Sequence, residues 1–256
     1  MSARLKPAAA GASAGSGVTA FEETGAATPR DLQAPTAAAI TQGSSISEEF
    51  RILATKVRSI AEERPFACIG VVSASAGEGK TTVTLGLATA LAQEPGRRVL
   101  LVEADLRKPS ISRYLGLPPA NGLAEWIEGS GATVPVRRVI PQNFHLLAAG
   151  RTGGERRHEF LQSERMGKLL AAARGAYDWV LLDCPPLTPV ADAVVLQDLL
   201  DGFLLVVRER HAPVDVITRA LSHVKADRIQ GMVLNDHHEA LRKYSRYGYK
   251  DYGQYE

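Results

Sequence analysis

The sequence predicts an α/β fold in which a doubly wound, mainly parallel sheet carries helices on both faces. Short continuous apolar runs alternate along the chain with longer segments of helical periodicity, which is the pattern of buried parallel strands joined by crossover helices. A glycine-rich turn directly follows the first apolar run and precedes a helical segment. With 256 residues, of which 45% are hydrophobic, the chain is large enough to build one core of ordinary size.

The chain opens with a segment of different composition. Residues 1–42 are dominated by Ala, Gly, Ser, Thr and Pro, and the few large apolar residues among them are isolated. Such a segment cannot bury enough apolar surface to offset the entropy of ordering it, so we expect a disordered leader. We expect the folded domain over residues 43–240 and a separate tail over residues 241–256.

The folded domain is expected to begin with an amphipathic helix over residues 44–63. Phe50, Leu53 and Val57 recur there at helical spacing, and Ser47 can cap the helix. Strands and helices then alternate. We expect strands at residues 66–74, 97–104, 144–150, 178–183, 202–208 and 231–235. We expect further helices at residues 80–93, 159–175, 190–200 and 213–226.

Composition and charge argue against several classes of protein. The net charge of +2 gives no bias toward nucleic acid, so we expect no nucleic-acid partner. No apolar run approaches the roughly 20 residues of a membrane helix. The two cysteines, Cys68 and Cys184, lack metal-ligand spacing and favour a reducing compartment over a disulfide scaffold. We therefore expect a cytoplasmic protein.

The sharpest motif is SASAGEGKTT, residues 73–82, between the first buried strand and its helix. Backbone amides of such a loop and of the helix N-terminus form a cradle for phosphate oxygens. Lys80 can reach the β- and γ-phosphates, and the Thr81 hydroxyl can ligate Mg²⁺. Ala74 stands where the common pattern has its first glycine. The residues expected to bind the nucleotide are Ser75, Ala76, Gly77, Glu78, Gly79, Lys80, Thr81 and Thr82.

Two carboxylates stand at the ends of buried strands. Asp183 ends the strand WVLLD, and Asp105 closely follows the strand in VLLVEA. The carboxyl ends of parallel strands meet at one edge of a sheet, so both acids are expected to face the phosphate loop and, with Thr81, to hold Mg²⁺. The alternative for each acid is a solvated loop residue or a helix cap.

Five of the seven tyrosines fall within the last fourteen residues, KYSRYGYKDYGQYE. Their spacing fits neither a strand nor a helical face, and the residues between them are polar, which predicts a tail and not a part of the core. The two other tyrosines, Tyr114 and Tyr177, are expected to serve packing. The tail tyrosines are Tyr244, Tyr247, Tyr249, Tyr252 and Tyr255.

Together, these motifs resemble those of the bacterial tyrosine kinases of capsule and exopolysaccharide biosynthesis, of the type without membrane helices. The resemblance covers residues 44–256: SASAGEGKTT is similar to the Walker A motif of that family, VLLVEADLRKP to its Walker A′ and YDWVLLDCPPLTPVADAVVL to its Walker B. It implies a P-loop NTPase fold with a deviant Walker A motif and a MinD-like architecture. It also implies an enzyme that uses ATP and Mg²⁺ to phosphorylate its own terminal tyrosines between protomers, and so regulates polysaccharide polymerisation and export.

The resemblance assigns catalytic roles to Lys80, Glu103, Asp105, Arg107 and Asp183. Glu103 replaces the first Asp of the family's D-x-D-x-R pattern, a candidate to receive or orient the tyrosine proton. Because Glu carries the same charge with one more methylene, Glu103→Asp is expected to hold or raise activity. The tail tyrosines are the implied phosphate acceptors.

The resemblance also implies partners. They are a membrane protein of the chain-length-regulator (Wzz-like) class, which would recruit the chain to the inner face of the membrane, a tyrosine-protein phosphatase, and further copies of the chain. The family's ring-forming helix carries E-x-x-R-x-x-R, whereas this chain has Glu48, Arg51 and then Ala54, which leaves the ring form open. The segment 150–160 also departs from the family's Pro/Asn-rich loop.

Two alternatives remain open. The substitution at Glu103 is compatible with a nucleotide-binding adaptor that has weak or no kinase activity. ATPases of the MinD/ParA type share the predicted fold, but they carry a signature Lys where this chain has Ser75, and they lack a tyrosine-rich tail. Formation of phosphotyrosine separates the kinase from both alternatives.

Overall fold

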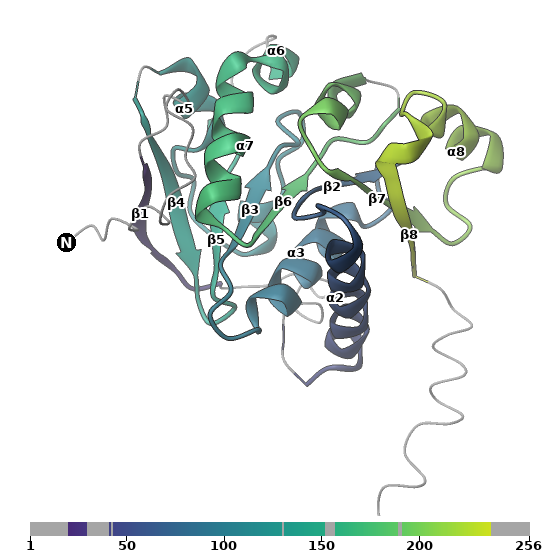
Figure 1. Cartoon of the computed structure of the whole chain (residues 1–256), viewed down its shortest axis with the longest axis horizontal. Coiled ribbons are helices and arrows are strands. Elements are labelled where there is room, and N and C mark those ends of the chain that lie inside the picture. Colours follow the sequence, from purple (N-terminus) through teal and green to yellow (C-terminus); the bar gives the residue numbers. More distant parts are fainter. Residues whose placement is uncertain are drawn as a thin grey trace, which may run out of the picture.

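A single sheet organises the chain, with its strands in the order β1-β4-β5-β3-β6-β2-β7-β8 (Figure 1). The computed structural model describes residues 20–29, 41, 43–129, 131–151, 157–188 and 191–236. Within these residues, neighbouring strands are parallel except for the antiparallel pair β4–β5, which confirms the prediction of a mainly parallel sheet. The strands are β1 (Ala20–Ala27), β2 (Cys68–Ser73), β3 (Val99–Glu103), β4 (Thr133–Val139), β5 (Phe144–Leu147), β6 (Trp179–Asp183), β7 (Gly202–Arg208) and β8 (Ile229–Asn235).

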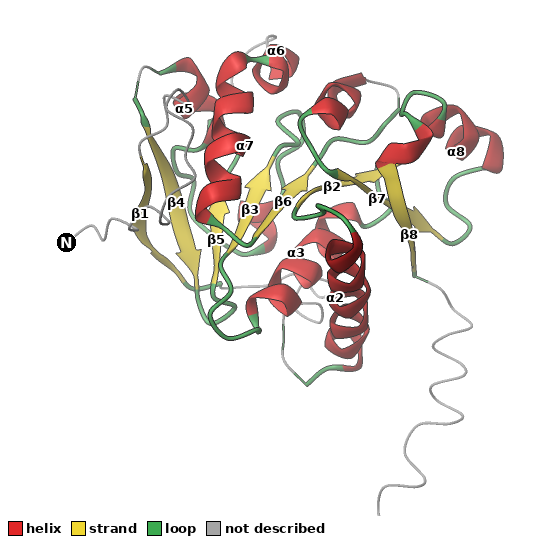
Figure 2. Ribbon diagram, viewed as in Figure 1, coloured by secondary structure: helices red, strands yellow, loops and turns green. Residues whose placement is uncertain are grey.

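Helices cover both faces of this sheet (Figure 2). On one face α5, α7 and α8 enclose a core with the strand residues Val72, Leu182 and Phe203, and on the other α2, α3 and α4 enclose a second core with Ile69 and Leu181. This arrangement confirms the doubly wound architecture. The helices are α2 (Ser45–Glu63), α3 (Lys80–Ala92), α4 (Ile111–Tyr114), α5 (Leu123–Glu128), α6 (Arg157–Gln162), α7 (Glu164–Ala176), α8 (Val214–Leu221) and the 3₁₀ segments η1 (Ala191–Asp198) and η2 (Ala226–Arg228).

The first helix, α2, matches its predicted extent and buries the face that its sequence pattern indicates. Phe50, Ala54 and Val57 are buried against α3. Its N-cap is Ser44, whose hydroxyl accepts a hydrogen bond of 3.0 Å from the amide of Ser47. The predicted capping residue, Ser47, therefore lies inside the helix and donates the capping amide.

Several elements differ from the sequence prediction. The helix expected at residues 159–175 is divided into α6 and α7, with Ser163 as the N-cap of α7, and the short helices α4 and α5 were not predicted. Residues 20–27 fall within the predicted disordered leader but form β1, which pairs with β4 at the edge of the sheet. Strand β4 itself was not predicted. The helix expected at residues 190–200 is the 3₁₀ segment η1. The remainder of the leader, apart from residues 28, 29 and 41, lies outside the described residues.

Strand register brings the carboxyl ends of the central strands to one edge. Asp183 at the end of β6 pairs with Glu103 at the end of β3, and on its other side with Val71 of β2. Strand β2 continues only to Ser73 before the phosphate loop begins. The loop therefore lies at the same edge as Asp183 and Glu103. Asp105, the other acid predicted at this edge, follows β3 by two residues, and both Asp105 and Asp183 lie beside Lys80 of the loop. Among the described helices, none is both long and apolar enough to cross a membrane.

Candidate nucleotide site

The phosphate loop joins β2 to the first turn of α3, as the motif predicts. Gly77 and Gly79 have φ angles of 86° and 87°, in the left-handed region that favours glycine. A side chain at position 79 would also collide with the side-chain amide of Asn235. The two glycines thus allow a tight turn whose amides can approach phosphate oxygens closely.

The buried side chain of Glu78 fixes the phosphate loop through hydrogen bonds. Its Oε1 atom accepts hydrogen bonds from the amide of Ser75 (2.6 Å) and from the Ser75 hydroxyl (2.9 Å). Oε2 accepts a hydrogen bond of 3.2 Å from the amide of Arg208 at the end of β7. Glu78, which was predicted among the nucleotide-binding residues, therefore connects two parts of the loop to the sheet, leaving the loop's other amides to face a ligand.

Two residues outside the motif also support the loop. The Asn235 side chain at the end of β8 donates a hydrogen bond of 2.9 Å to the carbonyl of Glu78. His211, in the turn after β7, lies with its Nε2 atom 2.9 Å from the carbonyl oxygen of Ala76. The sequence analysis assigned no role to either. Both contacts join residues more than 130 positions apart, so the local sequence around Asn235 and His211 carries no signal for them.

Lys80, Asp183 and Asp105 meet beneath the loop. The Nζ atom of Lys80 lies 3.1 Å from Asp183 Oδ1 and 3.6 Å from Asp105 Oδ2, and all three side chains are at most 10% exposed. Burial alone would lower the pKa of Lys80, but the negative charges of Asp183 and Asp105 outweigh this effect and raise it above its ordinary value. Lys80 is therefore charged and is held at the position where the motif expects phosphate.

Thr81 and Asp183 present oxygen ligands at the same point. The Thr81 hydroxyl donates a hydrogen bond of 2.7 Å to Asp183 Oδ2. A hydroxyl and nearby carboxylates are the hard oxygen donors that Mg²⁺ prefers. The described residues contain no group of three or more His, Cys, Asp or Glu side chains suited to a metal ion. The donors thus fit the partial coordination of Mg²⁺ in P-loop sites, where nucleotide phosphates and water complete the shell.

Asp105 and Arg107 lie on the segment that follows β3. Asp105 Oδ1 accepts a hydrogen bond of 3.0 Å from the amide of Lys108, which fixes the turn. The Arg107 guanidinium forms a two-point ion pair with Asp192 of η1, and its Nη2 atom lies 3.3 Å from Asp192 Oδ1. Asp192 belongs to the predicted Walker B segment, but it was not singled out in the sequence because its partner is 85 positions away.

Glu103 lies at the same edge, but its side chain is only 1% exposed. It is therefore brought into the cluster of predicted site residues, beside Asp183, without reaching the surface. Thr82 occupies the first turn of α3 next to Thr81. The predicted phosphate acceptors Tyr244, Tyr247, Tyr249, Tyr252 and Tyr255 lie outside the described residues.

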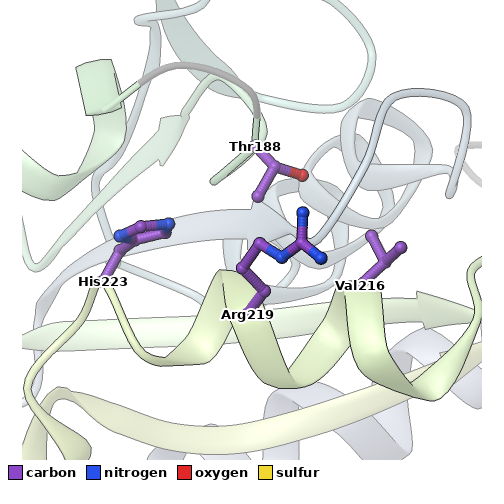
Figure 3. A pocket seen from close by; sticks show the side chains of 4 residues that line it. All are labelled: Thr188, Val216, Arg219 and His223. Atoms are coloured by element: carbon purple, nitrogen blue, oxygen red, sulfur yellow. The ribbon is translucent and has the colours of Figure 1, made fainter.

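A separate hollow of about 270 Å³ lies beside α8 (Figure 3). Its lining side chains are Thr188, Val216, Arg219 and His223. The amide of Thr188 donates a hydrogen bond of 3.2 Å to the carbonyl of Ala74, so the hollow borders the strand end before the phosphate loop. None of the predicted nucleotide-binding residues lines it, and the nucleotide site is defined by the loop itself.

Comparisons with known proteins agree with this geometry. The model of the family described as "CobQ/CobB/MinD/ParA nucleotide binding domain" matches residues 69–246. Tyrosine-protein kinase YwqD of Bacillus subtilis is 31% identical over 215 residues, which cover 82% of this chain and 89% of YwqD. The succinoglycan biosynthesis transport protein ExoP of Rhizobium meliloti is 36% identical over 186 residues, which cover 69% of this chain and only 23% of ExoP.

Solved structures give the same assignment. The kinase domain of the Escherichia coli tyrosine kinase ETK superimposes with a TM-score of 0.71 at 27% identity, covering 80% of this chain and 81% of that domain. The family match extends over more than half of the chain, and YwqD is matched over most of its length. The phosphate loop, the two strand-end acids and these similarities show that the chain belongs to the bacterial tyrosine kinases, within the CobQ/CobB/MinD/ParA group of nucleotide-binding domains.

Proposed function

We propose that this chain transfers the γ-phosphoryl group of ATP to the tyrosines of its own C-terminal tail, each protomer acting on the tail of another. The observation that carries the proposal is the convergence of Lys80, Thr81 and Asp183 under the phosphate loop of a chain that belongs to the bacterial tyrosine kinases. Such a constellation suits phosphoryl transfer, which depends on positioning and on charge stabilisation more than on a strong base.

In this proposal, the loop amides and Lys80 bind the triphosphate. Lys80 exchanges its contact with Asp183 for the β- and γ-phosphates and offsets their negative charge. Thr81, Asp183 and Asp105 would hold Mg²⁺, which when bound supplies further neutralisation of the phosphate charge. Arg107 is positioned by Asp192 at the rim of the site, where about 45% of its side chain is exposed and accessible to a substrate.

The described part of the chain ends next to the site. Asn235, the last residue of β8, contacts the carbonyl of Glu78 in the phosphate loop. Tyr244 follows Asp236 by eight residues. At no more than about 3.6 Å per residue, this tyrosine lies within roughly 29 Å of Asp236, and the later tail tyrosines have a longer reach. The spaced tyrosines of such a tail could enter the site of another protomer one after another.

We further propose that this reaction regulates polymerisation and export of an exopolysaccharide. Among the relatives, ExoP is named a succinoglycan biosynthesis transport protein. A membrane protein of the chain-length-regulator (Wzz-like) class would recruit the chain to the inner face of the membrane, and a tyrosine-protein phosphatase would reverse the reaction. Each added phosphate contributes about −1.5 to −2 charges, so repeated transfer would make the tail strongly acidic and weaken contacts between protomers.

The alternative of a nucleotide-binding adaptor with little kinase activity is favoured by one observation, the burial of Glu103. Incubation with ATP and Mg²⁺, followed by phosphotyrosine detection, separates the two functions. The kinase predicts phosphotyrosine that disappears in Lys80→Met. An adaptor predicts nucleotide binding without any phosphotyrosine, even with the cytoplasmic segment of the membrane partner present.

A further inference from the structure

Glu103 ends β3 with a carboxylate that accepts three hydrogen bonds from backbone amides. Its Oε1 atom accepts hydrogen bonds of 2.6 Å from the amides of Ser110 and Ile111. Its Oε2 atom accepts a hydrogen bond of 3.1 Å from the amide of Ala149. Both carboxylate oxygens therefore have partners.

The three amides come from two different segments. Ser110 and Ile111 begin α4, so one oxygen of Glu103 satisfies backbone donors at the start of this helix. Ala149 follows β5, and its carbonyl accepts a hydrogen bond of 3.0 Å from the amide of Ala124 in α5. Glu103 thus connects the end of β3 to the start of α4 and to the segment after β5.

Ser110, which Glu103 holds, also contacts one of the predicted metal ligands. The Ser110 hydroxyl lies 3.2 Å from the Thr81 hydroxyl, which in turn donates to Asp183. Asp105 belongs to the same short segment, between Glu103 and Ser110. Holding the amide of Ser110 therefore fixes one end of a segment whose other end is β3, and Asp105 is carried between these two fixed points.

The family resemblance suggested instead that residue 103 takes the tyrosine proton. Burial raises the pKa of Glu103 above its ordinary value, which would suit a base, although the three amide hydrogen bonds act in the opposite direction. A base, however, must lie within hydrogen-bond reach of the proton that it removes. With 1% exposure and both oxygens occupied by amides, Glu103 is closed to a tyrosine hydroxyl.

We propose that Glu103 is a positioning residue that anchors residues 104–111, and that it takes no proton from the substrate. The effect of this anchor on catalysis rests on the proposed kinase function. The anchoring contacts themselves do not depend on it. The anchor also explains why position 103 carries Glu, with one more methylene than the Asp of the family pattern. An Asp carboxylate would be withdrawn by roughly one C–C bond, about 1.5 Å, and would not reach the amides of both segments.

The two roles predict opposite orders of activity for substitutions. If Glu103 is an anchor, Glu103→Gln keeps the length and one acceptor oxygen, so it should retain more activity than Glu103→Asp. Glu103→Asp should lose on the order of 100-fold, because displacement by about 1 Å has that effect when catalysis rests on positioning. If Glu103 is a base, Glu103→Asp should match or exceed the wild type, and Glu103→Gln should be less active than Glu103→Asp.

Hydrogen exchange of the nucleotide-free chain tests the anchor without any catalysis. In Glu103→Asp and Glu103→Ala, the amides of Ser110, Ile111 and Ala149 should exchange faster than in the wild type, whereas amides in β7 should not change. Unchanged protection of all three amides would overturn the proposal. Hydrogen exchange tests the anchor even if the wild type forms no phosphotyrosine. The absence of phosphotyrosine would contradict the proposed kinase function but not the anchor.

Glu125 offers a matched control. Its Oε2 atom accepts a hydrogen bond of 2.8 Å from the amide of Gly122, and its Oε1 atom accepts one of 2.7 Å from the amide of Arg151. Glu125→Asp is therefore the same substitution at another carboxylate that binds backbone amides of two segments. It disturbs the segment after β5, which Glu103 also contacts, but has no hydrogen bond to Ser110 or Ile111, so it should leave activity within a few-fold of the wild type.

The pH dependence of the turnover rate completes the test. Glu103→Gln should keep the pH profile of the wild type at a reduced rate. Loss of one limb of the profile in Glu103→Gln would show that Glu103 exchanges a proton in the reaction, and would contradict the anchor.

Discussion

The Nζ atom of Lys80 lies 3.1 Å from Asp183 Oδ1, so the lysine expected to bind phosphate is already paired with the acid expected to bind the metal. Both side chains are buried, and Thr81 and Thr84 also donate to Asp183, at 2.7 and 3.4 Å. These side chains therefore form a satisfied cluster. In the proposed function, a nucleotide replaces the contact between Lys80 and Asp183 with one to phosphate, which would couple nucleotide and metal binding.

Lys80→Met should abolish labelling of the tail while the fold persists, because it removes the positive charge that faces the β- and γ-phosphates. It should also lower the free energy of unfolding by about 3–5 kcal/mol, since Asp183 loses its buried counter-charge. Labelling with radioactive ATP and urea unfolding measure these two effects. Lys168→Met is the matched control, because Lys168 is paired with Glu164 on the surface of α7 and should change neither.

Asp183→Asn should weaken nucleotide binding in the presence of Mg²⁺ far more than in its absence, because a metal ligand loses its charge. The difference can be measured by titrating a fluorescent nucleotide with and without Mg²⁺. Asp198→Asn provides the comparison, since Asp198 forms an exposed pair with Lys225. An equal loss with and without Mg²⁺ would remove Asp183 from the metal site.

Replacement of all five tail tyrosines by Phe should eliminate autophosphorylation and leave ATP binding intact. The variant keeps the sequence of the phosphate loop and of the strand-end acids, and removes only the five tail hydroxyls. Peptide mapping by mass spectrometry would contradict this prediction if most phosphate lay on Tyr114 or Tyr177. Tyr177 is only 4% exposed and packs edge-on against Phe21, with ring centroids 5.1 Å apart, as expected for a packing residue.

Stability should fall on acidification because of His145. Burial lowers the pKa of His145 below its ordinary value, although Glu23, whose Oε2 atom lies 3.5 Å from Nε2, opposes this effect. The unfolded chain therefore takes up a proton near pH 6.5, whereas the folded chain does so only at lower pH. The free energy of unfolding should decrease as the pH falls from about 6.5 toward the folded-state pKa.

His145→Gln removes this titration, so its unfolding free energy should depend less steeply on pH across that interval. Urea unfolding at a series of pH values makes the comparison. Parallel curves for the variant and the wild type would show that His145 does not contribute.

The local part of the site could be predicted from the sequence. The phosphate loop and the strand-end acid Asp183 carry their information in adjacent residues, and the register of parallel strands brings them together. The supporting contacts could not be predicted in the same way. The hydrogen bond from Asn235 to Glu78 and the ion pair between Arg107 and Asp192 depend on how distant segments pack.

Strand β1 shows why composition misled the prediction for the leader. Only Phe21 and Ala27 of this strand are buried. Its remaining contacts are backbone pairing with β4 and polar contacts such as the hydrogen bond of 3.2 Å from Thr24 Oγ1 to the carbonyl of Val136. An edge strand can use main-chain hydrogen bonds in this way, so it needs few apolar residues.

The measurement that tests the central claim most directly is the intact mass of the chain after incubation with ATP and Mg²⁺, with the cytoplasmic segment of a chain-length-regulator partner present. We expect successive phosphoryl additions, up to the five tail tyrosines, that map to residues 244–255 and vanish in Lys80→Met. An unchanged mass for the wild type, or additions that persist in Lys80→Met, would contradict the assignment of this chain as a tyrosine autokinase.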